Sequence, residues 1–377
     1  MKIIQKKYST TGGWIEARHD EVEHYEMDLV LAFAPAGLLS KGNLHEEIAG
    51  MFPMAQVLIS SASGEFIGDR VTDDELTLTA IRFEKAKAKT AITDIATSKN
   101  SFEAGYYLSR AFEHDGLRSL IVFCDGEHVN ASQLVFSLQQ YLPADVIITG
   151  GLAGAQDKQA SLIGLNNKPA EGRIACIGLY GKDLRVSYGN QSGWMPFGPE
   201  RKVTRAKNNT VYELGGIPVL EVYNLYLRDR KYNLPGSQML FPIAVRFENS
   251  SGTVIRTIQS IDEGLFSITY SGNVPEGSRV SLLRTDCDSL ISGAAGAASV
   301  TMNQLPAPEL AIIMSCAERR TLLNGRTSEE LSALKNAFGT HTAISGLFTP
   351  GEIAPAGPDL KCELFKQSVI VTAISEN

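Results

Sequence analysis

The sequence predicts a mixed α/β protein of two domains, built from repeated strand-helix-strand units with mixed sheets. Three observations predict this fold. The 377 residues are too many for one ordinary core. A content of 44% hydrophobic and 20% charged residues is typical of a packed globular protein. Short apolar runs of strand length alternate with segments whose apolar residues recur at helical spacing. We expect the boundary between the two domains near residues 217 and 218, because chain-breaking residues cluster at Gly215-Gly216-Ile217-Pro218.

The first predicted unit begins with the apolar run Leu29 to Phe33. A helix is expected from Asn43, where Glu46 stands three residues further on and suggests a capping box. The strand-like run AQVLISS follows, ends in a turn at Gly64-Glu65, and leads to the alternating segment LTLTAIRF. The order is strand, helix, strand, glycine turn, strand.

The same order is predicted twice more along the chain. In the second unit SLIVFC precedes a helix capped by Asn130, the strand-like run DVIITGGLAGA carries a glycine turn at Gly150-Gly151, and RIACIGLYG completes the unit. In the third unit LAIIMSC precedes a helix capped by Thr327 and Glu330, and a turn at Gly351-Glu352 leads to SVIVTAI. The similar offsets from cap to turn suggest three related modules.

A different pattern separates the second and third units. Residues 203–284 contain short strand-like runs between turn residues, which is typical of an antiparallel sheet. The following segment CDSLISGAAGAASV is predicted to be a helix of Gly, Ala and Ser, a composition that lets another backbone or a flat ligand approach closely. Tight helix packing is the simpler of these two interpretations.

Charge and cysteine usage exclude several classes of protein. The formal net charge is -7 and no dense Lys/Arg run occurs, so nucleic acid is not an expected partner. No apolar run approaches the roughly 18 residues that a membrane-spanning helix needs, and the N-terminus lacks the apolar stretch of a secretory signal. The five cysteines form an odd set without CxxC spacing, which argues against disulfides and zinc. We expect a cytoplasmic protein with no membrane contact.

The glycine turns are the candidate ligand-binding segments, because ligands of α/β sheets usually bind beyond the carboxyl ends of strands. Glycine there either lets backbone amides reach a ligand or merely permits a turn. The carboxylates at comparable positions either bind an amino or hydroxyl group or hydrogen-bond turn amides. The candidate ligand-binding residues are Gly64, Glu65, Asp125, Gly150, Gly151, Gly351 and Glu352.

Known catalytic signatures are absent from the sequence: we find no G-x-G-x-x-G, P-loop, G-x-S-x-G or H-E-x-x-H motif. No catalytic residue is therefore assigned. His128 is the candidate metal ligand, because it lies in a loop between a buried strand and a helix cap, where its ring could enter a cleft. A solvated loop histidine is the simpler interpretation. Cys124 and Cys316 follow buried strands in two units and are either thiolates acting as nucleophile or metal ligand, or small core residues.

Several segments in order resemble the FIST family, among them CDGEHVN, ITGGLAGA, SGWMPFGP, VTRAKNNTVYEL and GLFTPGEIAP. Residues from about 28 to 218 resemble its N-terminal part and those from 219 to about 374 its C-terminal part. The resemblance implies an N-terminal extension over residues 1–27 and domains over residues 28–217 and 218–377. The resemblance implies a sensory protein of signal transduction that binds a small ligand, and not an enzyme. A free-standing chain of this layout is most similar to bacterial nitric-oxide-sensing haem proteins that regulate a partner histidine kinase in a two-component system.

That resemblance implies a haem b cofactor, with ferrous iron held by a neutral imidazole and one side open to nitric oxide. We nominate His128 as the iron ligand, with Cys124 or Cys316 as alternatives. The expected partners are a histidine kinase or other signalling protein and a gaseous or metabolite ligand, with a homodimer possible. Phe365 stands where family members often carry a histidine. The alternatives are a haem-free sensor of a small metabolite such as an amino acid, and a cysteine-dependent enzyme.

Overall fold

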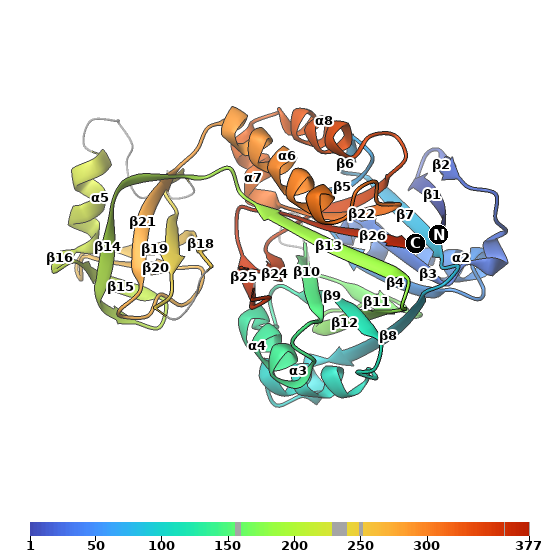
Figure 1. Cartoon of the computed structure of the whole chain (residues 1–377), viewed down its shortest axis with the longest axis horizontal. Coiled ribbons are helices and arrows are strands. Elements are labelled where there is room, and N and C mark those ends of the chain that lie inside the picture. The colour runs from blue at the N-terminus through green and yellow to red at the C-terminus, as the bar shows by residue number, and fades with distance from the viewer. Residues whose placement is uncertain (155–159, 228–239, 249–251, 358, 377) are drawn as a thin grey trace.

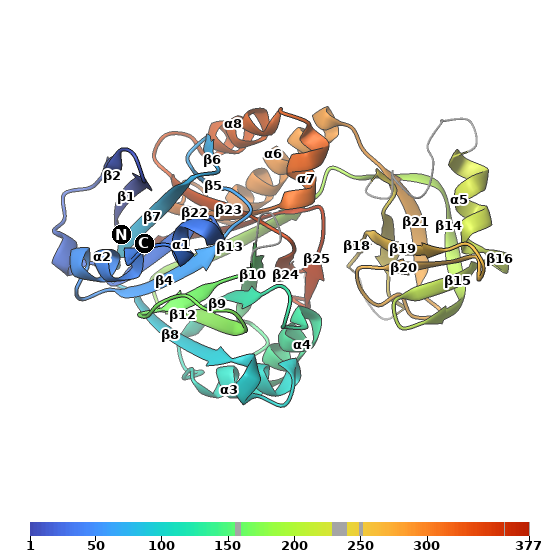
Figure 2. The same ribbon diagram turned by 180° about the vertical axis from the view of Figure 1, so that it is seen from behind.

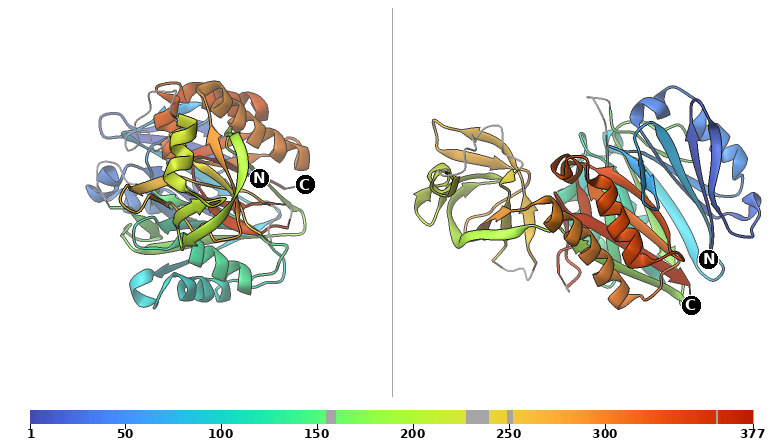
Figure 3. Two further views of the ribbon diagram at one scale, coloured as in Figure 1. Left: turned by 90° about the vertical axis from the view of Figure 1, so that its left-hand side faces the viewer. Right: turned by 90° about the horizontal axis from the view of Figure 1, so that it is seen from above.

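The computed structural model describes residues 1–154, 160–227, 240–248, 252–357 and 359–376. These residues form a body of three six-stranded sheets and a smaller, mainly antiparallel β domain at one side of it (Figures 1 and 2). The right-hand view of Figure 3 shows the connections that join the β domain to the body. The predicted mixed α/β class with repeated units and mixed sheets is confirmed. No helix among the described residues has the length and apolar character that spanning a membrane requires.

Each of the three units contributes the central strands of one sheet. The first unit comprises β3 (Leu29–Ala34), α1 (Ala36–Ser40), α2 (Leu44–Met51), β4 (Gln56–Ser61) and β7 (Glu75–Arg82). The second comprises β9 (Leu117–Asp125), α4 (Ala131–Tyr141), β10 (Ile147–Ala153) and β12 (Arg173–Tyr180). The third comprises β22 (Leu310–Cys316), α7 (Ala317–Leu323), α8 (Thr327–Phe338), β23 (Ala343–Thr349) and β26 (Val369–Glu376). In every unit the first two strands are parallel, because a helix connects them, and the third strand is antiparallel to the first.

The remaining strands of the body complete the three sheets. They are β1 (Lys2–Ser9), β2 (Gly13–His19), β5 (Glu65–Ile67), β6 (Arg70–Thr72), β8 (Lys87–Asp94), β11 (Ile163–Leu165), β13 (Leu184–Gln191), β24 (Glu352–Pro355) and β25 (Cys362–Phe365). The strand orders are β11-β4-β3-β7-β1-β2 in the first sheet, β25-β24-β10-β9-β12-β8 in the second and β13-β26-β22-β23-β5-β6 in the third. Residues 1–27, expected as an extension, are part of the first sheet: β1 pairs along the whole length of β7.

The units exchange strands in a cycle. After β4 of the first unit the chain crosses to the third sheet, where β5 pairs with β23. After β10 of the second unit, β11 pairs with β4 in the first sheet. After β23 of the third unit, β24 pairs with β10 in the second sheet. Each sheet is therefore completed by a strand that belongs to another unit.

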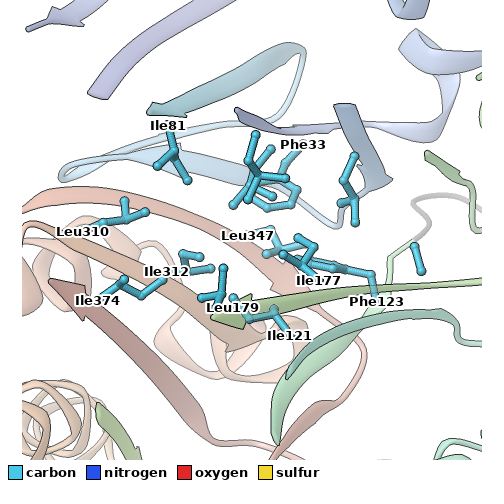
Figure 4. Close-up of a cluster of buried hydrophobic side chains, with 14 of the residues drawn as sticks. Phe33, Ile81, Ile121, Phe123, Ile177, Leu179, Leu310, Ile312, Leu347 and Ile374 are labelled. Atoms are coloured by element: carbon cyan, nitrogen blue, oxygen red, sulfur yellow. The ribbon is translucent and has the colours of Figure 1, made fainter. Parts of the chain in front are cut away.

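The main core lies where the three sheets face one another, as Figure 4 shows. Phe33 and Ile81 come from the first sheet, Phe123 from the second, and Ile312 and Leu347 from the third. Strands β3, β9 and β22 are buried almost throughout, because helices or strands cover both faces of their sheets. This double burial explains why their sequences are nearly continuous apolar runs.

Helices cover the outer faces of the sheets. Helices α1 and α2 pack on the first sheet, α3 (Ser101–Arg110) and α4 on the second, and α6 (Cys287–Gln304) and α8 on the third. Two 3-10 helices, His24–Glu26 and Ile95–Thr97, lie in connections. The predicted cap at Asn130 is confirmed, since its side chain accepts a hydrogen bond from the Gln133 amide at 3.1 Å. Asn43 makes no such side-chain bond, and Arg326 rather than Thr327 is the N-cap of α8.

The β domain is inserted between β13 and α6. It comprises β14 (Met195–Lys207), β15 (Thr210–Leu214), β16 (Ile217–Pro218), α5 (Val219–Leu227), β17 (Ile243–Arg246), β18 (Val254–Arg256), β19 (Ile258–Asp262), β20 (Ser267–Tyr270) and β21 (Arg279–Arg284). Every described strand pair in it is antiparallel, as predicted. Gly215 and Gly216, next to the predicted boundary between residues 217 and 218, form a tight hairpin in which Leu214 pairs directly with Ile217.

The predicted small-residue helix is α6, and its composition serves backbone packing. A Cβ atom on Gly293 would lie 2.4 Å from the backbone nitrogen of Gly193, in the connection that leads to the β domain. A Cβ on Gly189 of β13 would lie 2.0 Å from the carbonyl oxygen of Ala297. Small residues are therefore required where α6 crosses β13 and the connection.

Candidate functional site

The three predicted turn segments meet at one end of the body. The Ser63 amide donates to the carbonyl of Phe348 at 2.9 Å, and the Gly154 amide donates to the carbonyl of Ser61 at 3.0 Å. The Leu152 amide in turn donates to the carbonyl of Gly351 at 2.9 Å. The carboxyl ends of β4, β10 and β23 are thus joined in a closed cycle of backbone hydrogen bonds, in which each amide donates to a carbonyl of another segment.

Gly150 and Gly151 do not form the expected turn. Both lie inside β10, where Gly150 pairs with Val122 of β9 and with Ile353 of β24, and Gly151 pairs with Glu352. A Cβ atom on Gly150 would lie 2.1 Å from the carbonyl oxygen of Val122. The missing side chain therefore gives room to a neighbouring strand.

Glu65 is fully buried at the start of β5. Its Oε1 accepts a hydrogen bond from the Thr72 hydroxyl at 3.0 Å, and its Oε2 has no hydrogen-bond partner among the described residues. Burial raises the pKa of Glu65 to about 9, so the carboxyl is neutral at pH 7. The adjacent Gly64 has a φ of +119° and leaves room for the guanidinium of Arg320, which pairs with Asp73.

Glu352 is also fully buried, at the start of β24. It accepts hydrogen bonds from the hydroxyls of Thr349 at 2.8 Å and Ser368 at 2.9 Å. Burial raises the pKa of Glu352 to about 7. Gly351 directly precedes it and supplies the carbonyl that Leu152 contacts. These hydrogen bonds hold β24 against the end of β23 and the start of β26.

Asp125 ends β9 and is 1% exposed. It accepts hydrogen bonds from the backbone amides of Gly172 at 2.6 Å, Glu127 at 2.7 Å and His128 at 3.1 Å. Burial alone would raise the pKa of Asp125, but these amide donors outweigh it and lower the pKa. Of the two interpretations offered by the sequence, binding of turn amides is the one seen.

His128 lies in the surface loop between β9 and α4, with 48% of its side chain exposed. Its Nδ1 is 3.1 Å from Oδ2 of Asp125, and this hydrogen bond raises the pKa of His128. No hydrogen bond from Nε2 to another described residue is present. The ring is therefore oriented by a carboxylate while one nitrogen stays available.

The two candidate cysteines are buried in the body. Cys124 is the next-to-last residue of β9 and Cys316 ends β22. Burial raises the pKa of both thiols. Neutral thiols in these places fit core packing, and neither has the thiolate character of a nucleophile or an iron ligand. Among the described ranges, no group of three or more His, Cys, Asp or Glu side chains is arranged to hold a metal ion.

A cleft that the sequence did not indicate lies between the body and the β domain. Its volume is about 950 Å³. One wall is the start of α4, from Ala131 to Gln133, with Gly126, Val129 and Asn130 of the loop before it. A second wall is β25 with Lys366. The β domain supplies the third wall, around Asn208, Arg256 and Asn273. A smaller cavity of about 490 Å³ is lined by Tyr188, Thr253 and other residues of the two parts, and β24 and β25 form part of its wall as well.

The fold and this cleft define a mixed α/β protein in which an inserted β domain faces a body of three units. Comparison with protein families places the chain more closely: residues 28–217 match the FIST N domain and residues 220–355 match the FIST C domain. The chain therefore belongs to the FIST family. Domains of this family are sensory domains of signal transduction. Both matched regions reach the cleft, since α4 lies in the first and Arg256 in the second.

Other comparisons add no argument about function. No curated protein matches the chain. Among solved structures, the cyanuric acid hydrolase from A. caulinodans is 11% identical over 76% of this chain and 99% of that chain. Its TM-score of 0.19 is too low to support an inference.

Proposed function

We propose that this chain senses a small polar ligand, which binds in the cleft between the body and the β domain. The observation that carries the proposal is the cleft itself, because three separate parts of the molecule wall it. Side-chain amides dominate its polar lining, and they can donate and accept hydrogen bonds. The amide residues are Asn130, Gln133, Gln139, Asn208, Asn209, Gln259 and Asn273.

The position of the cleft supports a route from binding to signal. A ligand that contacts α4 and the β domain together favours one arrangement of the two parts. Strand β25 lies at the cleft and contacts β18 of the β domain, so movement of that domain also acts on β24 and on Glu352. We propose that a histidine kinase or another signalling protein reads the resulting change in surface.

A ligand screen tests the proposal. We expect a small polar metabolite to raise the melting temperature, because a ligand selective for the folded state stabilises it. Replacing Gln133 and Asn273 together by alanine should weaken binding about tenfold or more, since each lost hydrogen bond contributes about 1 kcal/mol. The control Gln304→Ala changes an amide in the smaller cavity and should bind normally. Small-angle scattering that is unchanged by a bound ligand would contradict the signalling route.

Haem is the second candidate ligand, and the His128–Asp125 hydrogen bond favours it. Histidines that hold metals commonly donate their other ring N–H to a carboxylate, as His128 can do through Nδ1. Gly126 and Val129, on either side of this histidine, line the cleft. Bound ferrous haem would supply an open coordination site for nitric oxide. Haem ranks second because polar atoms make up most of the exposed lining of the cleft. The apolar residues of the lining are Val129, Ala131, Phe136, Leu152, Phe247, Pro275, Cys362 and Leu364.

Absorption spectroscopy tests the haem candidate. If it holds, reconstituted protein shows a Soret band that shifts with nitric oxide, and His128→Ala abolishes both while far-UV circular dichroism is unchanged. Asp125 raises the pKa of His128, so the proton competes with iron and haem binding should weaken as the pH falls. The absence of a Soret band, or a band indifferent to His128→Ala, would overturn the assignment.

A further inference from the structure

One arginine in the wall of the cleft is buried without a full set of partners. Arg256 ends β18 and is only 3% exposed. Its Nη1 donates to the carbonyl of Leu364 at 2.8 Å. Its Nε has no hydrogen-bond partner among the described residues. Gly272 makes room for this guanidinium, since a Cβ atom there would lie 2.6 Å from Nε.

The acidic residue nearest to this guanidinium does not neutralise it fully. Nη2 of Arg256 is 3.8 Å from Oε2 of Glu363, which is beyond hydrogen-bond distance. Burial lowers the pKa of Arg256 and raises the pKa of Glu363, so it disfavours the charged form of each side chain. A buried charge is costly unless it is paired and hydrogen-bonded. A further hydrogen-bond acceptor at the guanidinium would therefore reduce this cost.

Two other positive groups face the same cleft. The first turn of α4 lines it, carries no acidic residue, and offers the positive end of the helix dipole. Lys366 also lines the cleft, and its Nζ donates to the carbonyl of Pro350. Glu363 is the only acidic side chain among the described residues of the lining. The described residues of the lining therefore carry more positive than negative charge, with Arg256 and Lys366 against Glu363.

We propose that the cleft takes a small oxyanion, a carboxylate or phosphate compound, whose oxygens bind Arg256. Guanidinium groups bind carboxylate and phosphate oxygens through parallel, charge-assisted hydrogen bonds. The amides around the cleft would bind the uncharged remainder of the ligand. This inference rests on the proposed function, because it names the chemical class of the ligand for the same cleft.

Calorimetric titration at low ionic strength tests the inference with two separate probes, sodium succinate and inorganic phosphate. Saturable binding of succinate alone assigns a carboxylate, and binding of phosphate alone assigns a phosphate compound. Arg256→Met should weaken binding of the successful probe at least tenfold, since hydrogen bonds to charged groups contribute about 1.5–3 kcal/mol. The control Arg246→Met removes an exposed arginine of the same domain, paired with Glu200, and should bind within twofold of the wild type.

Further variants keep the test decisive. Arg256→Met leaves Glu363 without its cation, so the double variant Arg256→Met with Glu363→Met is used if the single variant unfolds. Failure of both probes to bind the folded wild type, or equal weakening by Arg256→Met and Arg246→Met, would overturn the inference. A neutral ligand whose binding requires Gln133 and Asn273 but not Arg256 would overturn the oxyanion inference and still support the sensing proposal. Oxyanion binding that requires Arg256 but leaves the arrangement of the two domains unchanged would support the oxyanion inference and contradict the sensing proposal.

Discussion

Replacing Arg319 by methionine is expected to lower the free energy of unfolding by about 3–5 kcal/mol, because it removes one partner of a fully buried ion pair. Arg319 of α7 donates through Nε to Oε1 of Glu330 at 3.1 Å, and neither side chain is exposed to solvent. Its other nitrogens donate to the carbonyls of Leu290 in α6, Gln367 before β26, and Ser192 in the connection to the β domain. The substitution thus also releases three carbonyls that one guanidinium binds.

Denaturant unfolding followed by near-UV circular dichroism measures this effect. The double variant Arg319→Met with Glu330→Met should recover part of the loss, because no uncompensated charge then remains buried. Arg326→Met is the matched control: this arginine pairs with Glu329 and Asp288 in solvent, and its loss should change stability little. Equal effects of Arg319→Met and Arg326→Met would show that the buried pair does not stabilise the fold.

Gly150→Ala is the second substitution with a large expected effect. The new methyl group would lie 2.1 Å from the carbonyl oxygen of Val122, so β9 and β10 would have to separate. We expect a loss of about 1–3 kcal/mol in the free energy of unfolding, as in other overpacked cores. Gly151→Ala should cost less, because it contacts the movable side chains of Met314 and Thr349 at 2.9 and 3.0 Å.

Gly50→Ala is the control for this prediction. Gly50 lies in α2, and a Cβ atom there meets nothing within 4 Å. Alanine should therefore stabilise the protein by about 0.5–1 kcal/mol, since glycine is a poor helix former. Gly150→Ala and Gly50→Ala would be compared in thermal unfolding and in ligand binding. A Gly150→Ala protein of unchanged stability that no longer binds ligand would restore the original hypothesis of a glycine site.

Local patterns were sufficient to predict the units, but not how they combine. Apolar runs such as Leu29 to Phe33 identify buried strands because burial on both faces requires apolar side chains throughout. The partner of each exchanged strand depends on packing between segments far apart in the chain, which periodicity does not encode. Glu330 matched a capping box by its spacing, whereas its actual partner is Arg319, in another helix.

The candidate site was harder to predict, for related reasons. Adjacent glycines are typical of turns, and Gly215-Gly216 and Gly150-Gly151 look alike in sequence. The first pair forms a hairpin and the second lies inside a strand, because only β10 has a neighbouring backbone close enough to exclude side chains. The cleft is walled by three distant segments, so no single motif marks it. Arg256 resembles any charged residue of an exposed strand until its burial is known.

The cyclic exchange of strands has a consequence for biosynthesis. Chains emerge from the ribosome N-terminus first, so β5 is made long before β23, the strand with which it pairs. Strand β10 likewise waits for β24, and until then an edge of the second sheet is open to unwanted pairing. A fragment that ends at residue 217 would contain β5 and β10 without β23 and β24, the strands with which they pair. The first sheet contains only strands that end before residue 166, whereas the second sheet is completed by β24 and β25, from the last part of the chain. The second unit therefore keeps an unpaired sheet edge until almost the whole chain has been made.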